Sequence, residues 1–118
     1  MKLINSILTI GVVMLFSSFP LFADSSVHKH TSEAIKHAVA AEKEGKNGNA
    51  KELLGHAEES LKHAKVALTE LKDGDQRVHV TESIRHLNQA ISSAKENRAE
   101  EATKHVDEAL VHLKKSAS

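Results

Sequence analysis

Nine histidines and no cysteine occur in this chain of 118 residues. Eight of the histidines belong to four copies of one pattern, H-x-x-E-[AS]-[IL]-x-H. Side chains three and four residues apart are neighbours on a helix, so each copy would bring two imidazoles and a carboxylate to one face. These nitrogen and oxygen donors bind divalent metals. The pattern predicts metal binding by His30, Glu33, His37, His56, Glu59, His63, His79, Glu82, His86, His105, Glu108 and His112.

The two histidines of one copy cannot comfortably share an ion. Seven residues of helix separate them by about 10.5 Å of rise, whereas a metal–nitrogen bond is only about 2.0–2.1 Å long. Each copy therefore offers two half-sites that share one glutamate, and a second helix or water must complete them. The ninth histidine, His28, forms a His-Lys-His sequence with His30 and is predicted to add a flexible ligand.

Composition and motifs exclude several other functions. Without cysteine there are no disulfides, thiolate zinc sites or cysteine nucleophiles. Sixteen basic residues balance sixteen acidic ones, which argues against binding to nucleic acid, because phosphate contacts need a basic surface. There is no G-x-S-x-G, no H-E-x-x-H and no glycine-rich phosphate loop, so we expect no enzymatic activity.

The N-terminal residues are typical of a secretory signal peptide. Lys2 is followed by an uncharged segment whose apolar part runs over 7–16, and Ala23 precedes Asp24. About ten apolar residues are too few for a spanning helix, which needs roughly 20. We expect cleavage after Ala23, a periplasmic domain over 24–118, and no stable membrane insertion after cleavage. That domain has no methionine or aromatic residue, so soft ligands for Cu(I) are absent.

The remaining sequence is rich in good helix formers and is interrupted at three places. These interruptions predict helices over 27–45, 49–72, 76–96 and 98–115. Asn49 with Glu52, and Asn97 with Glu100, resemble capping boxes. A shift of 49 residues aligns the two halves without a gap and places His30 on His79. We therefore predict an all-α, up-down-up-down four-helix bundle built from two duplicated helical hairpins.

The histidines are predicted to flank the core of this bundle. At about 100° per residue, the histidine stripe lies roughly a quarter turn from the stripe of alanines and leucines. Reversing a helix mirrors its stripe, so the histidines must converge either within the two hairpins or between them. Folding each hairpin at its turn puts His37 level with His56 and His30 level with His63, which favours the first arrangement. The handedness of the bundle decides between them, and the sequence leaves it open.

The repeats resemble those of the small metal-binding protein (SmbP-like) family, most closely over His56–Lys65 and then over Thr103–Leu110. The resemblance implies a periplasmic four-helix bundle that binds several copper and other divalent ions and acts as a scavenger or buffer. It also implies that the family's repeated histidines correspond to the eight repeat positions here.

Copper(II) is the metal expected to bind tightest to such donors, with nickel(II) or zinc(II) possible. We expect a monomer. The alternative is a structural or protein-interaction bundle of the cell envelope without a metal role. This alternative predicts that the protein binds a partner protein equally well with and without a metal chelator.

Overall fold

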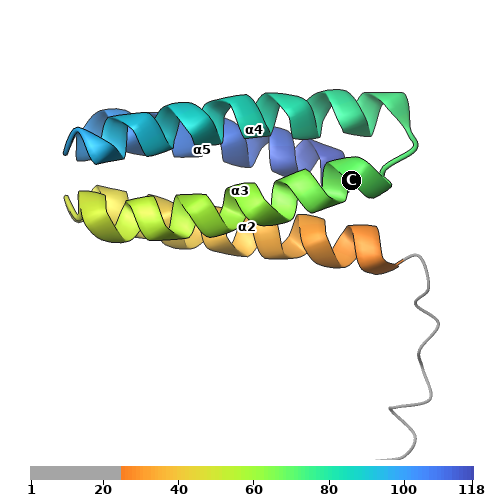
Figure 1. Ribbon diagram of the computed structural model, residues 1–118, viewed down its shortest axis with the longest axis horizontal. Helices are drawn as coiled ribbons and strands as arrows, with labels where there is room; N and C mark the ends of the chain where they lie inside the picture. The colour runs from red at the N-terminus through yellow and green to blue at the C-terminus, as the bar shows by residue number, and fades with distance from the viewer. Residues whose placement is uncertain (1–24) are drawn as a thin grey trace, which may run out of the picture.

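The computed structural model describes residues 25–118, so the predicted signal peptide over 1–23 lies outside the described residues. Four antiparallel helices make up this part of the chain (Figure 1). They are α2 (Ser25–Lys46), α3 (Ala50–Glu70), α4 (Gly74–Lys95) and α5 (Ala99–Ala117). The predicted up-down-up-down bundle of two hairpins is confirmed. None of these helices combines the length and the apolar character that crossing a bilayer requires.

The two hairpin turns have the same geometry, as the duplication requires. Gly48 has a φ of 79° and Asn97, which is 49 residues later, has a φ of 60°. In each turn the amide of the following residue donates a 2.9 Å hydrogen bond back to the last turn of the preceding helix. Glycine and asparagine are the residues that best tolerate this left-handed conformation, so both positions end a helix.

The predicted capping boxes are therefore wrong. Asn97 belongs to the end of α4, and Arg98 occupies the N-cap of α5. The side chain of Asn49 makes no capping bond and instead donates to Glu44 Oε1 at 2.8 Å. In both cases the need for a left-handed residue, or for a partner across the turn, outweighs the capping preference of asparagine.

The connection between the hairpins also differs from the prediction. Helix α3 ends at Glu70 because Leu71 is extended, with a ψ of 136°. Helix α4 begins at Gly74, two residues earlier than predicted, because the Asp73 carboxylate accepts a hydrogen bond from the Gln76 amide at 3.0 Å. This side-chain cap satisfies a donor that the first helical turn would otherwise leave free.

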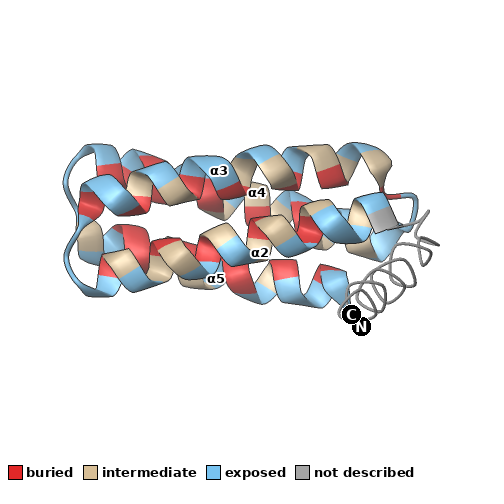
Figure 2. Ribbon diagram, turned by 90° about the horizontal axis from the view of Figure 1, so that it is seen from below, coloured by how far each residue is buried: buried red, intermediate tan, exposed pale blue. Residues whose placement is uncertain are grey.

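The core is thin and aliphatic. Its largest fully buried side chains include Leu53, Leu87 and Leu113, one from each of three helices. Between them runs the predicted stripe of small residues, all of them buried: Ala34, Ala38, Ala41, Ala57, Ala64, Ala90, Ala94, Ala102 and Ala109. Figure 2 shows the buried residues facing the inside of the bundle along every helix. No histidine of the described residues belongs to this core.

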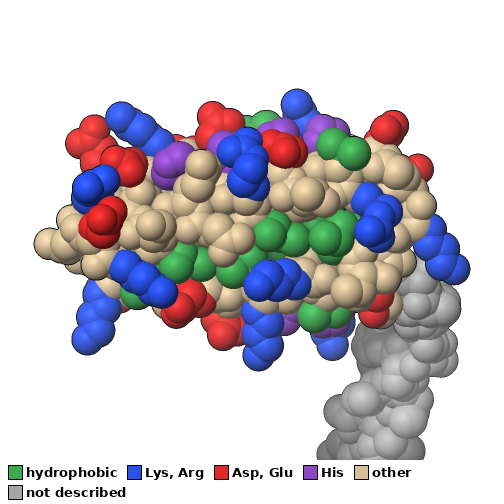
Figure 3. Space-filling view, turned by 45° about the horizontal axis from the view of Figure 1, so that its top comes forward, with side chains coloured by type: hydrophobic (Ala, Val, Ile, Leu, Met, Phe, Trp, Pro, Cys, Tyr) green, Lys and Arg blue, Asp and Glu red, His purple; other side chains and the backbone are tan. Residues whose placement is uncertain are grey.

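Histidines and aliphatic side chains occupy different surfaces of the bundle. The isoleucine or leucine of each repeat packs on the core. Ile35, Leu61 and Ile84 are half-buried, and Leu110 is buried. Hydrophobic side chains form a band along the middle of the face in Figure 3, and histidines lie toward its upper and lower edges. The helices thus present their imidazoles on one side of the core stripe and their aliphatic residues on the other.

Candidate metal centre

The eight repeat histidines meet within the hairpins, in the seam between α2 and α3 and in the seam between α4 and α5. The histidines that face each other across each hairpin are the pairs predicted from folding the hairpin at its turn. His30 lies against His63 and His37 against His56, with ring centroids 5.4 and 6.0 Å apart. The corresponding separations in the second hairpin are 5.5 Å for His79 and His112 and 5.9 Å for His86 and His105. Of the two arrangements that the sequence leaves open, this is the one that level matching favours.

Staggered contacts join these pairs into two continuous rows. The rings of His37 and His63 are nearly parallel, at 6° and 5.7 Å. Those of His86 and His112 repeat the contact at 12° and 5.9 Å. We call the resulting series of four rings in each hairpin an imidazole row. The first row is His56, His37, His63 and His30, and the second is His105, His86, His112 and His79.

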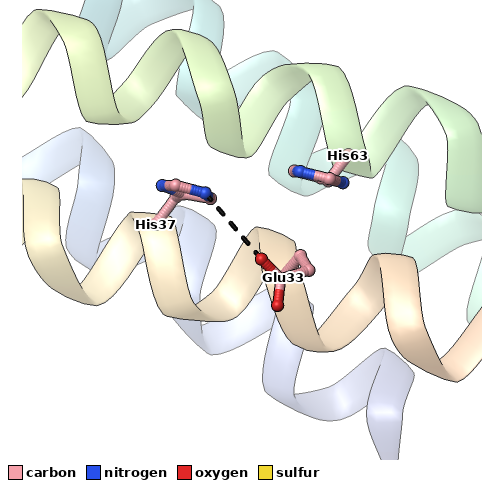
Figure 4. A group of neighbouring side chains, drawn as sticks. All are labelled: Glu33, His37 and His63. Atoms are coloured by element: carbon pink, nitrogen blue, oxygen red, sulfur yellow. Dashed lines mark ion pairs between the residues drawn. The ribbon is translucent and has the colours of Figure 1, made fainter.

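A glutamate joins the two inner rings of each row. One ligand atom each from Glu33, His37 and His63 lie within 4.8 Å of one another. Glu33 and His37 are one turn apart on α2, and their Oε1 and Nε2 atoms are 4.0 Å apart (Figure 4). The ring of His63 extends from α3 toward them. The second hairpin repeats this trio with Glu82, His86 and His112.

The trios lie at the surface, where an ion can enter. All six of their residues are half-buried. Burial lowers the pKa of the His63 imidazole, and the neighbouring His30 and His37 lower that pKa further. Burial likewise lowers the pKa of His86, followed by the charge of Arg85. The lowered pKa keeps the His63 and His86 imidazoles neutral at pH values where an ordinary histidine begins to protonate, and the neutral form is the one that binds a metal.

The second trio contains an unpartnered buried nitrogen. Within residues 25–118, two buried side-chain atoms lack a hydrogen-bond partner, and one of them is His86 Nδ1. A buried polar atom without a partner is costly unless something else binds it. Because Arg85 Nη2 lies 3.2 Å from Nε2 of the same ring and can only donate, Nδ1 carries the ring hydrogen and lacks an acceptor.

The remaining predicted ligands lie outside the trios. His30, His56, His79 and His105 are the outer rings of the rows. Glu59 and Glu108 are exposed, and so is His28, which is in neither row. The sequence pattern treats all four glutamates alike, whereas in the structure only the glutamate of the first helix in each hairpin reaches the inner rings.

Arg85 contacts two residues of the second trio, although the repeat pattern does not specify the residue at its position. Its Nη2 donates to Glu82 Oε1 at 2.7 Å and lies 3.2 Å from His86 Nε2. The hydrogen bond from Arg85 is also the main cause that lowers the pKa of Glu82. A variable position inside the motif, occupied by lysine, arginine or valine, is the only sequence signal that could have drawn attention to it.

Comparison with known families agrees with this geometry. The sequence profile of the family described as "Small metal-binding protein" matches residues 1–116. No curated protein matches the chain.

Proposed function

The chain belongs to the small metal-binding protein family, and on that premise we propose that it is a periplasmic copper(II) buffer whose two trios are its principal binding centres. The observation that carries this proposal is the convergence of one carboxylate and two imidazoles in each hairpin. Two helices supply each set, which overcomes the weakness of a half-site on one helix.

Copper(II) fits the donors better than other common divalent ions. The trios offer nitrogen and oxygen atoms only, and for such sites the general affinity order places copper above nickel and zinc. Nickel(II) and zinc(II) then bind to the same centres more weakly. The absence of sulfur ligands in residues 24–118 disfavours Cu(I).

An open coordination shell suits exchange of the ion. Three protein donors leave at least one position for water. Glu59 lies four residues before His63 on α3, close enough to complete the first centre by a change of rotamer, and Glu108 is placed in the same way before His112. An ion held at the surface by three or four such donors can be taken up and released, as buffering requires, without a catalytic role.

The outer histidines orient the inner ones. The Nδ1 atoms of His30 and His63 are 3.1 Å apart, and those of His79 and His112 are 3.2 Å apart. One nitrogen of each pair must carry the hydrogen. If His63 donates, its Nε2 keeps a free lone pair for the metal, which is how ligating histidines are commonly held.

Periplasmic location rests on the N-terminal segment. A charged start, a short apolar stretch and Ala23 before Asp24 match an export signal. N-terminal sequencing of protein from the periplasmic fraction should begin at Asp24. Recovery of the full-length chain in the cytoplasm would refute this part of the proposal.

Metal specificity is tested by titrating residues 24–118 with Cu(II), Ni(II) and Zn(II) separately. Calorimetry should show saturable uptake, tightest for copper. The matched control is the same chain with excess chelator, which should abolish the heats. Saturable uptake of none of the three metals at neutral pH would leave the structural or protein-interaction bundle as the better account.

A further inference from the structure

The two centres are unequal, and the inequality is due to one residue. In the first trio, Glu33 Oε1 faces His37 Nε2 directly at 4.0 Å. In the second trio, Arg85 Nη2 lies between the equivalent atoms, 2.7 Å from Glu82 Oε1 and 3.2 Å from His86 Nε2. A cationic nitrogen thus contacts the carboxylate and one imidazole that would receive the ion.

The duplication supplies an internal control for this arrangement. A shift of 49 residues places Arg85 on Lys36. Lys36 is exposed and forms no ion pair with Glu33 in the part of the chain that the structure describes. Arginine presents a planar fork of donors that can bridge two acceptors, whereas lysine is a single, strongly hydrated charge on a flexible stem. Lys36 and Arg85 therefore have the same charge, but only Arg85 contacts the glutamate and histidine of its trio.

We propose, on the basis of the proposed function, that Arg85 is a built-in competitor for the metal in the α4·α5 centre and makes it the weaker of the two. Before an ion binds there, the guanidinium must leave Glu82 and His86 and swing into solvent. The side chain of Arg85 is 54% exposed, so the solvent into which the guanidinium must move is already beside it. The chain then has one centre that fills first and a second that fills at higher free metal, which widens the concentration range over which it buffers.

The size of the effect follows from the exposure of the pair. Exposed ion pairs contribute little because water and salt screen them, so the competition should change the affinity for the metal by at most roughly fivefold. We expect copper to bind the α4·α5 centre roughly two- to fivefold more weakly than the α2·α3 centre. The difference should narrow as salt is added, because screening weakens the pair.

Single-centre variants make the comparison direct. His37→Gln with His63→Gln leaves the α4·α5 centre, and His86→Gln with His112→Gln leaves the α2·α3 centre. Each is titrated with Cu(II) alone. Arg85→Lys in the first background should tighten binding to the level of the other centre. Lys36→Arg in the second background should weaken it by a similar factor.

The outcomes separate this inference from the proposed function. Copper uptake by both backgrounds with equal affinities, or a difference that survives Arg85→Lys, would overturn the role of Arg85 and leave the proposed function standing. Uptake by neither background would overturn both. All four variants change exposed or half-buried side chains outside the core, and circular dichroism should show the helical content of the unaltered chain.

Discussion

The Nδ1 atoms of His30 and His63 lie 3.1 Å apart across the seam between α2 and α3. The same contact recurs at 3.2 Å between His79 and His112. Each pair joins the outer ring of a row to an inner ring that belongs to a trio. The outer ring therefore governs which nitrogen of the inner ring is free.

Removing the Nδ1 partner that His30 gives to His63 should weaken the first centre without deleting it. His30→Phe keeps an aromatic ring but leaves His63 Nδ1 without its partner, and loss of such an orienting bond costs roughly 10- to 100-fold in metal affinity. His30→Asn retains a side-chain oxygen that can accept and should recover much of the loss. Copper calorimetry measures both, with His28→Phe as an exposed control outside the rows. A lower number of ions with unchanged affinity would instead identify His30 as a ligand.

The stability of the metal-free protein should fall as the pH drops below about 6.5. Burial lowers the pKa of His63 and His86 in the folded state, so the unfolded chain takes up protons first as the solution is acidified. Above the pKa that these histidines have in the unfolded chain, they do not lower the free energy of unfolding. Below it they do, and the loss of stability grows as the pH falls toward their pKa in the folded state. Thermal melts of residues 24–118 between pH 7.5 and 5 should show it. A His63→Gln, His86→Gln variant should lose less stability over that range, and an equally steep loss would contradict the assignment.

Copper should raise the melting temperature, and chelation should reverse the rise. A ligand at a hundredfold excess over its Kd stabilises the folded state by about 2.7 kcal/mol per site. In a domain of this size that corresponds to roughly 10–20 °C. Differential scanning calorimetry with and without EDTA measures the shift. No change in melting temperature under saturating copper would mean that the ion binds the unfolded chain equally well.

Two glycines should respond oppositely to alanine. A side chain at Gly45 would collide with Thr103 and Leu53, because α2 passes close to α5 and α3 there. Gly45→Ala should destabilise by roughly 1–3 kcal/mol. Gly55 lies in α3 with open space beside it, so Gly55→Ala should stabilise by about 0.5–1 kcal/mol. Urea denaturation compares the two, and a neutral Gly45→Ala would show that the helices can separate without cost.

Much of the fold and the level of the histidines could be predicted from the sequence. Helical periodicity placed the imidazoles beside the core, and the turn positions set His37 opposite His56. Level matching favoured the seam within each hairpin, where the structure places the histidines, but it could not decide the choice, because that depends on how the hairpins wind around each other. Two further features depend on rotamers and backbone angles that the repeat does not encode. Glu33 reaches the inner rings while Glu59 is exposed, and Asn97 adopts a left-handed conformation.

The most direct test is equilibrium dialysis of residues 24–118 against Cu(II) near pH 7.5, followed by elemental analysis. The decisive variant replaces the four inner histidines with glutamine: His37, His63, His86 and His112. It should lose at least two copper ions per chain while its helical circular dichroism is unchanged, and His28→Gln should bind as the unaltered chain does. If the fourfold variant keeps the full copper content at the same affinity, the trios are not the binding centres.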